Sequence, residues 1–404
     1  MKKINFLIIA LLASVNLSSQ INLSWAKNVG GSGFDDAQAI STDQNGNVYI
    51  AGSFNGTVDF DPGAGTFTIT SAGAADGYVA KYDAGGNFIN AVSFTNNLDC
   101  KVYSIAIDNL NNVIVTGAFT GSVDFEPGPG STLLVAGGYY DIFAVKLTSG
   151  LGFVWAHNFG YAGGDDFGNS VATDNNNNIL LTGCFQGSNI DFDPGGTTYY
   201  LSSQGLRDVF VLKLDANAGF LWAFGLGGTG SFQDMGQVIK TDATGNVIVS
   251  GYFSATVDFD PGAGNQPLTV SGNYDAFVAK YTSGGAYIWA GKFGGASNEV
   301  CYAIQLGSGG DIYCTGTFSG GTPCDFDPGI TTFNLTSNGT SEDVFVVKLT
   351  STGNFVWAKS MGGTGADFGR AIALDESLNN VYTAGYFTGI ADFDPSPVTN
   401  TLIS

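Results

Sequence analysis

Short apolar stretches recur along the chain and are separated by polar turns rich in Gly, Asn, Asp and Ser. The stretches are rich in β-branched and aromatic residues, as in 48–54 (Val-Tyr-Ile-Ala-Gly-Ser-Phe) and 275–281 (Asp-Ala-Phe-Val-Ala-Lys-Tyr). Such runs, bounded by turn residues, are typical of β-strands joined by hairpins. Because no 3.6-residue apolar periodicity follows the first 20 residues, the pattern predicts an all-β chain without helices.

The strands belong to a tandem repeat. The tetrapeptide Asp-Phe-Asp-Pro begins at Asp59, Asp191, Asp258, Asp325 and Asp392, and the variant Asp-Phe-Glu-Pro begins at Asp124. Successive spacings are 65, 67, 67, 67 and 67 residues. Four strong strand-like runs and a Thr-rich run recur around each motif in the same order. Four antiparallel strands per repeat predict a β-propeller with one four-stranded blade per repeat.

Two other repeat architectures fit the sequence less well than the propeller does. A β-solenoid coil is usually shorter and does not need four strands separated by hairpin turns. A string of β-sandwich domains is disfavoured because a sandwich needs about 100 residues. The propeller therefore remains the prediction.

The phase of the repeat suggests how the domain is organised. Residues 21–31 match only the fourth strand of a repeat, the segment that recurs around Trp155, Trp222, Trp289 and Trp357. Five complete copies follow, and a sixth stops at Ser404 without third or fourth strands. We expect a propeller domain over 20–404 that is truncated at the C-terminus. An open arc, or a six-bladed ring with one defective blade, is the alternative.

The N-terminus has the layout of a secretory signal peptide. Lys2 and Lys3 precede an apolar run over 6–13, and small polar residues follow. This segment is too short to anchor the chain stably in a bilayer. We predict a signal peptide over 1–19, export to the medium or the cell surface, and no membrane insertion.

The composition is strongly acidic, with a formal net charge of -21. Such a chain repels nucleic acid and anionic membrane surfaces. Glu occurs at only four positions, so nearly all of the 35 acidic residues are Asp, which favours turns. Five Cys are too few for a disulfide framework, although Cys301 and Cys314 could meet across a hairpin.

The acidic motif is the strongest candidate for a metal site. Strand alternation would place its two carboxylates on one face and the Phe on the other. We expect the Phe to plug the core between blades, the Asp residues to bind turn amides, and Pro-Gly to form a type II turn. The alternative is calcium, whose six to eight oxygen ligands could include both carboxylates. The candidate ligands are Asp59, Asp61, Asp124, Glu126, Asp191, Asp193, Asp258, Asp260, Asp325, Asp327, Asp392 and Asp394.

Three further residue types repeat or stand out. The third strand of each complete repeat carries a lysine, for which we expect an ion pair with a neighbouring Asp rather than a substrate-binding role. The Trp of the fourth strand is expected to pack between blades rather than to stack on a sugar. His157, the only histidine, takes the place of Lys27 and Lys359 in other copies, so it is not expected to act as a general base.

These segments resemble the bacterial seven-bladed β-propeller repeat family, called SBBP repeats, found in secreted Bacteroidetes proteins. The likeness lies in 343–349 (Asp-Val-Phe-Val-Val-Lys-Leu), 357–363 (Trp-Ala-Lys-Ser-Met-Gly-Gly), 367–372 and 380–385. It covers essentially all of 21–404. The resemblance implies an extracellular scaffold or binding surface. Relatives commonly end in a sorting domain for type IX secretion, which would lie beyond Ser404.

The sequence thus predicts a secreted or cell-surface binding module for an unknown protein or glycan, without catalysis and with calcium as a candidate cofactor. A carbohydrate-active lyase or glycosidase working in the propeller channel is the alternative, since paired carboxylates could cleave a glycosidic bond. An enzyme should break its own repeat symmetry at the reacting site. The departures seen in the sequence, such as Glu126, Cys324 and His157, are modest. A third reading makes the propeller a spacer for another domain.

Overall fold

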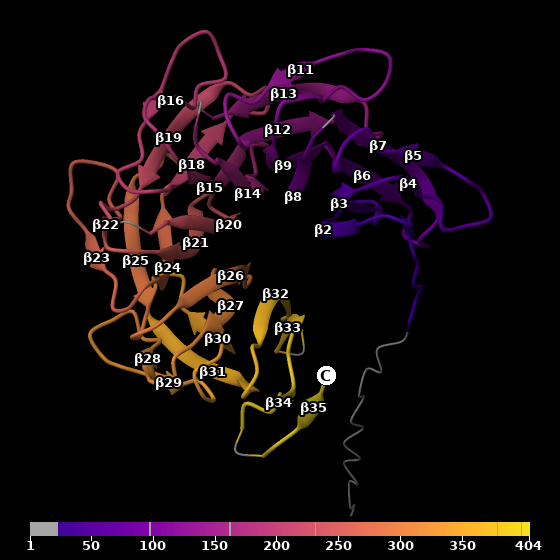
Figure 1. The fold of residues 1–404 in the computed structure, drawn as a ribbon. Helices are drawn as coiled ribbons and strands as arrows, with labels where there is room; N and C mark the ends of the chain where they lie inside the picture. Colours follow the sequence, from indigo (N-terminus) through magenta and orange to yellow (C-terminus); the bar gives the residue numbers. More distant parts are fainter. Residues whose placement is uncertain (1–22, 97, 161–162, 231, 378, 397) are drawn as a thin grey trace, which may run out of the picture.

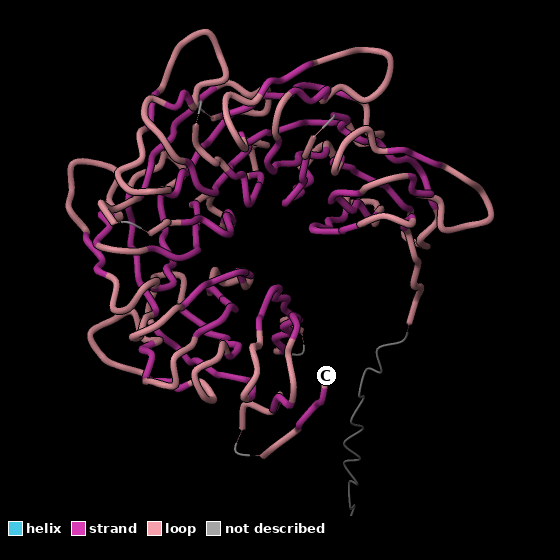
Figure 2. Tube along the Cα trace, viewed as in Figure 1, coloured by secondary structure: helices cyan, strands magenta, loops and turns pink. Residues whose placement is uncertain are grey.

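The computed structural model describes residues 23–96, 98–160, 163–230, 232–377, 379–396 and 398–404. All regular structure in these residues is β-strand, so the prediction of an all-β chain is confirmed. The predicted signal peptide lies outside the described residues. The sheets are arranged side by side in an arc around a central space (Figures 1 and 2).

Five blades, each a four-stranded antiparallel sheet, follow one another along the chain. Their first strands face the central space (Figure 1), and a sixth, two-stranded sheet continues the series. Blades 1 to 5 consist of β2 (Asp35–Thr42), β3 (Val48–Phe54), β6 (Asp76–Tyr82) and β7 (Phe88–Asn96); β8 (Cys100–Ile107), β9 (Val113–Phe119), β12 (Asp141–Leu147) and β13 (Phe153–Phe159); β14 (Phe167–Thr173), β15 (Ile179–Phe185), β18 (Asp208–Leu214) and β19 (Phe220–Leu226); β20 (Met235–Thr241), β21 (Val247–Phe253), β24 (Asp275–Tyr281) and β25 (Tyr287–Phe293); β26 (Glu299–Leu306), β27 (Ile312–Phe318), β30 (Asp343–Leu349) and β31 (Phe355–Gly363). The sixth sheet pairs β32 (Phe368–Asp375) with β33 (Asn380–Tyr386).

The first Asp of each acidic motif is the last residue of a short strand, which is the first strand of a small extra hairpin. This hairpin was not predicted as a separate element. The Thr-rich run after the motif forms the second strand of this hairpin. Several hairpins also pair with the fourth strand of the preceding blade, as β10 does with β7 and β34 does with β31. The hairpins are β4 (Thr57–Asp59) with β5 (Thr68–Thr70), β10 (Ser122–Asp124) with β11 (Leu133–Val135), β16 (Ile190–Asp191) with β17 (Tyr200–Leu201), β22 (Thr256–Asp258) with β23 (Pro267–Thr269), β28 (Pro323–Asp325) with β29 (Asn334–Thr336), and β34 (Ile390–Asp392) with β35 (Thr401–Ile403). A two-residue strand, β1 (Gly30–Gly31), pairs with β4.

The Phe of the motif fills the apolar core, as predicted. Phe125 is fully buried and packs edge-on against Phe119, with ring centroids 5.3 Å apart. It also contacts Phe143 of the third strand at 4.8 Å and Phe94 of the preceding blade at 5.4 Å. Phe192 and Phe326 likewise contact a Phe of the preceding blade. Burying one such side chain contributes about 1.5–3 kcal/mol, so these motifs tie their own blade to the previous one.

The repeated lysines form ion pairs with a neighbouring Asp, which confirms the sequence prediction, and most of these pairs are buried. Lys213 lies 2.9 Å from Asp174, which occupies the turn between the first two strands of the same blade. Lys213 also donates a hydrogen bond of 3.0 Å to the Ser283 carbonyl of the next blade. The same pairing recurs for Lys81 with Asp43, Lys146 with Asp108, Lys280 with Asp242 and Lys348 with Asp311.

The fourth-strand tryptophans lie between blades, as predicted. The Trp222 indole donates to the Ser283 carbonyl at 3.2 Å, the same acceptor that Lys213 uses. Its ring lies against Gly285, which has a φ of +84° and where a Cβ would meet the indole at 3.1 Å. We call this arrangement of Lys, Asp, Trp and one turn carbonyl the inter-blade latch. Trp25 makes the equivalent bond to Ala84 at 3.0 Å.

The structure also decides two further sequence expectations, the type II turn of the acidic motif and the disulfide between Cys301 and Cys314. The type II turn is wrong for four motifs, because Gly63, Gly195, Gly262 and Gly329 do not adopt a positive φ. In these four turns the second Asp accepts the amide hydrogen of the Gly instead. Only the variant motif has a Gly with a positive φ, which is Gly128 at +116°. All five cysteines are buried free thiols, so the disulfide between Cys301 and Cys314 is not formed.

The latch predicts a large loss of stability when its cation is removed. The Lys213 and Asp174 side chains are only 4% and 3% exposed, so Lys213→Met leaves a buried carboxylate without its partner. We expect the free energy of unfolding to fall by about 3–5 kcal/mol in urea titrations.

Lys348→Met is the matched control, because Lys348 and Asp311 are 19% and 37% exposed. An exposed pair contributes about 0–1 kcal/mol, so this variant should lose far less. Equal losses in the two variants would contradict the latch.

Candidate ligand-binding face

The two ends of the blades carry different kinds of residues. At one end lie the turns between first and second strands, where side chains of one blade bind the turn of the next. Asn109 donates to the Asn175 carbonyl at 3.2 Å, and Asn175 donates to the Ala243 carbonyl at 3.0 Å. Together with the latch, these bonds repeat from blade to blade, so this end has a structural role.

The opposite end carries side chains that differ between blades. There the first strands begin, the second strands end and the third strands begin. Aromatic rings and cations, most of them half-buried, lie in local groups along this end from blade 2 to the sixth sheet. We call this set the belt: Lys101, Tyr103, Tyr140, Phe167, Arg207, Phe232, Tyr252, Tyr274, Tyr302, Phe368, Arg370 and Tyr386.

Tyr140 begins the belt at the junction of blades 2 and 3. Its hydroxyl donates to Asp99 at 2.7 Å, and the Lys101 ammonium lies 3.3 Å from the same carboxylate. The Tyr140 and Phe167 rings approach to 5.5 Å. Blade 2 therefore presents an aromatic surface flanked by one cation and one anion.

Arg207 continues the belt within blade 3. Its guanidinium lies 5.1 Å from the centre of the Phe167 ring, within cation–π range. It also donates to Asp165 at 2.5 Å and to Gln233 of blade 4 at 2.9 Å. These contacts fix the position of the guanidinium between blades 3 and 4.

Two further groups of contacts complete the belt, one around Tyr274 and one around Arg370. Tyr274 lies 5.0 Å from Tyr252 and 5.7 Å from Phe232, whose side chain is 51% exposed. Farther along, the Arg370 guanidinium lies 4.0 Å from the centre of the Tyr302 ring. Exposed rings and planar cations offer stacking surfaces and hydrogen bonds, which suit a polar ligand such as a glycan or a peptide.

The variation in the belt does not follow from the needs of the fold. The third strands begin with Asp76, Asp141, Asp208, Asp275 and Asp343 in all five blades. The residue just before that Asp is Ala75, Tyr140, Arg207, Tyr274 or Glu342. A fixed position beside a variable one indicates that the variable residues serve something other than blade folding. Lining up the copies at this column could have revealed the belt from the sequence.

The predicted metal ligands lie apart from the belt, on the outer hairpins. In each motif the first Asp accepts two backbone amides, as Asp258 does from Asp260 and Gln266 at 3.0 and 2.8 Å. The second Asp accepts the amide two residues later, as Asp260 does from Gly262 at 2.8 Å. Within the described part of the chain, no group of three or more His, Cys, Asp or Glu side chains is placed to hold a metal. Calcium at these residues therefore stays a prediction.

Several buried acids with a raised pKa lie at the blade junctions. Burial raises the pKa of Asp234 to about 7 and that of Glu299 to about 8. Both side chains are at most 1% exposed, so neither can reach a substrate in the channel. His157 lies on β13 with its ring 5.5 Å from Trp155, and burial lowers its pKa.

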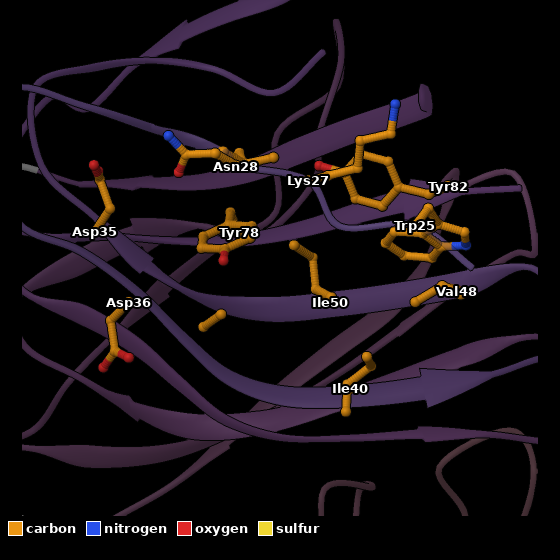
Figure 3. A pocket seen from close by; sticks show the side chains of 12 residues that line it. Trp25, Lys27, Asn28, Asp35, Asp36, Ile40, Val48, Ile50, Tyr78 and Tyr82 are labelled. Carbon is orange, nitrogen blue, oxygen red and sulfur yellow. The ribbon is translucent and has the colours of Figure 1, made fainter. Parts of the chain in front are cut away.

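A cavity of about 320 Å³ lies at the free face of blade 1 (Figure 3). Ile50, Tyr78 and Tyr82 line it, and Trp25 and Lys27 lie over it from the N-terminal segment. In the other blades the corresponding face packs against the preceding blade. The cavity is therefore an inter-blade surface, and it does not include the belt.

Comparison with known proteins agrees with this architecture. A family model described as a beta-propeller repeat, SBBP, matches residues 154–183. The match and the arrangement of the sheets support a β-propeller repeat architecture. The chain is 26% identical over 454 residues to an uncharacterized WD repeat-containing protein of Acanthamoeba polyphaga mimivirus. That alignment covers 92% of this propeller and 32% of the relative, so the propeller spans about a third of the relative's length. Among the residues that the structure describes, no helix is long and apolar enough to cross a membrane.

The belt predicts only a small loss of stability when its Arg207 cation is removed. Arg207 and Asp165 are 19% and 32% exposed, and exposed ion pairs contribute little to folding. Arg207→Met should therefore lower the free energy of unfolding by only about 1 kcal/mol in urea titrations. A loss as large as that expected for Lys213→Met would make the belt part of the structural framework.

The hydrogen bonds of the acidic motif predict a thermal stability that does not depend on calcium. Because the Asp oxygens already bind turn amides, the thermal midpoint of the full chain should be the same in excess EDTA, in millimolar Ca²⁺ and in Mg²⁺. A ligand that binds only the folded state must raise the midpoint. A Ca²⁺-specific rise that disappears in the Asp258→Asn/Asp260→Asn variant would instead establish the predicted calcium site.

Proposed function

We propose that this propeller is a non-catalytic binding module of an exported or cell-surface protein, and that the belt is its ligand-binding face. The observation that carries the proposal is the contrast between the two ends of the blades. One end repeats its hydrogen bonds from blade to blade, as Asn109 and Asn175 do. The other end changes its aromatic and charged residues in every blade.

The chemistry of the belt supports a protein or glycan ligand. Aromatic rings supply large contact areas at a small cost in side-chain entropy, and arginine adds planar hydrogen-bonding groups. Energetically dominant interface residues are enriched in these same types. The overall net charge of -21 disfavours nucleic acid and polyanionic surfaces, so a neutral or basic ligand fits best.

The N-terminal layout, which is typical of a signal peptide, supports export. This segment lies outside the described residues. Export would make the belt available to extracellular proteins or polysaccharides.

The proposal is tested by screening the full chain against arrays of extracellular glycans and peptides, followed by calorimetry on any hit. We expect Arg207→Ala and Tyr274→Ala to weaken binding at least about tenfold each, in line with the loss of an interface residue worth 1.4 kcal/mol or more.

Asn109→Ala and Asn175→Ala, at the opposite end, are the matched controls and should bind as the parent chain does. Loss of binding in the controls alone would place the ligand at the other end. Conversion of a bound glycan to shorter products would support the enzymatic alternative in place of the binding module.

A further inference from the structure

A groove of about 420 Å³ opens on the outer side of the propeller, at the junction of blades 3 and 4. Blade 3 lines it with β19 and with Tyr199, which directly precedes β17 of the outer hairpin. Blade 4 lines it with the loop of its acidic motif and with the turn between β24 and β25. These elements lie on the outer rim of the arc (Figure 1), and no residue of the belt lines the groove.

Tyr199 supplies a fixed aromatic ring to the groove. The residue is 41% exposed, and its ring packs against Phe220 with centroids 4.8 Å apart. Its backbone amide donates to Asp191 at 2.9 Å, which ties the ring's position to the acidic motif of blade 3. The Tyr199 hydroxyl has no hydrogen-bond partner among the described residues. The ring is therefore held in place while its hydroxyl remains available to a ligand.

The acidic motif of blade 4 brings a free acceptor to the same groove. Asp260 Oδ1 accepts the Gly262 amide at 2.8 Å, whereas Oδ2 accepts no hydrogen bond from a described residue. In blade 3 the corresponding oxygen of Asp193 accepts the Thr197 hydroxyl, and blade 5 repeats that bond. Blade 4 has Gly264 in place of this threonine, so one carboxylate oxygen of its motif is left without a partner.

Three further aromatic side chains line the groove. Trp222 and Phe224 are stacked, with ring centroids 5.5 Å apart and an interplanar angle of 9°. The Trp222 indole is already fixed by its latch bond to the next blade. Tyr287 lies at the start of β25, and its hydroxyl accepts the Ala290 amide at 2.9 Å. Rigid aromatic walls with a few polar groups are typical of small-molecule sites, whose volumes are about 300–1,000 Å³.

This combination does not recur at the other blade junctions that the structure describes. Eight residues after the first Asp of the motif, the other repeats carry Phe67, Thr132, Gln266, Phe333 and Asn400 in place of Tyr199. The equivalent groove between blades 1 and 2 is lined by Phe67 and Glu126. Phe67 has no hydroxyl, and the Glu126 carboxylate already accepts the Thr132 hydroxyl at 2.8 Å. A free phenol and a free carboxylate oxygen therefore meet only between blades 3 and 4.

We propose that this groove binds one neutral sugar unit of a glycan, as a site separate from the belt. A sugar ring has an apolar face of C–H groups that packs on aromatic rings, and hydroxyl groups at its edge. Such hydroxyls can donate to Asp260 Oδ2 in a charge-assisted hydrogen bond and can bond the Tyr199 hydroxyl. The same carboxylate repels acidic sugars, and the net charge of -21 acts in the same direction.

The test is calorimetry of the full chain in EDTA against cellohexaose, laminarihexaose and mannohexaose, with hexagalacturonate as the acidic counterpart. We expect at least one neutral hexasaccharide to bind. Tyr199→Thr removes the ring but keeps a residue that blade 2 has at this place, Thr132, and should weaken binding at least about tenfold. Asp260→Asn turns the free acceptor into an amide donor and should weaken binding by about tenfold as well.

The chain offers a matched control for each change. Phe67→Thr makes the same kind of substitution in the groove between blades 1 and 2, and Arg207→Ala changes the belt. Both variants should bind the neutral hexasaccharide as the parent chain does. Urea unfolding of every variant shows whether a loss of binding comes from the groove or from a loss of folded protein.

Three results would overturn the proposal. Absence of binding to all three neutral hexasaccharides at millimolar concentration would reject the sugar site. Tighter binding of hexagalacturonate would reject the neutral class of ligand. Equal affinity of the parent chain and Tyr199→Thr would place the sugar elsewhere; if Arg207→Ala then lost binding, the sugar would belong to the belt, and the proposed function would stand without this site.

Discussion

One turn carbonyl in each of blades 3, 4 and 5, bound by both the lysine and the tryptophan of the preceding blade, is the contact on which the structure depends. Ser283 O accepts from Lys213 at 3.0 Å and from Trp222 at 3.2 Å. The Asp174 carboxylate, 2.9 Å from the ammonium, balances the charge of this buried lysine. Burial opposes ionisation of Asp174, but hydrogen bonds from Lys213 and Asn178 outweigh it and lower the pKa of that carboxyl.

The latch also explains why the two ends of the blades can differ. It fixes the angle between neighbouring blades at the end of the first-to-second-strand turns, and the motif phenylalanines fill the space between sheets. At the other end short Gly-Gly connections, such as 294–295, lie at the junctions between blades. The surface residues beyond these connections can differ between blades, and these variable residues form the belt.

Much of this could be predicted from the sequence because each feature repeats at a fixed spacing. The strands, the buried Phe of the motif, the Lys–Asp pairs and the position of Trp222 all follow from local pattern and charge. The pairing of β10 with β7 could not be predicted, because it joins different repeats. The belt was missed for the same reason, since Arg207 meets Gln233 only after adjacent blades have docked.

Hydrogen exchange followed by mass spectrometry on the parent chain and on Lys213→Met tests the latch most directly, because local stability is resolved along the chain. The account predicts faster exchange on both sides of one junction, in β18 and the Asp174 turn of blade 3 and in the 282–286 turn of blade 4. Blade 1 should exchange as in the parent chain. A change confined to blade 3, with the 282–286 turn unaffected, would contradict the claim that the lysine fastens one blade to the next.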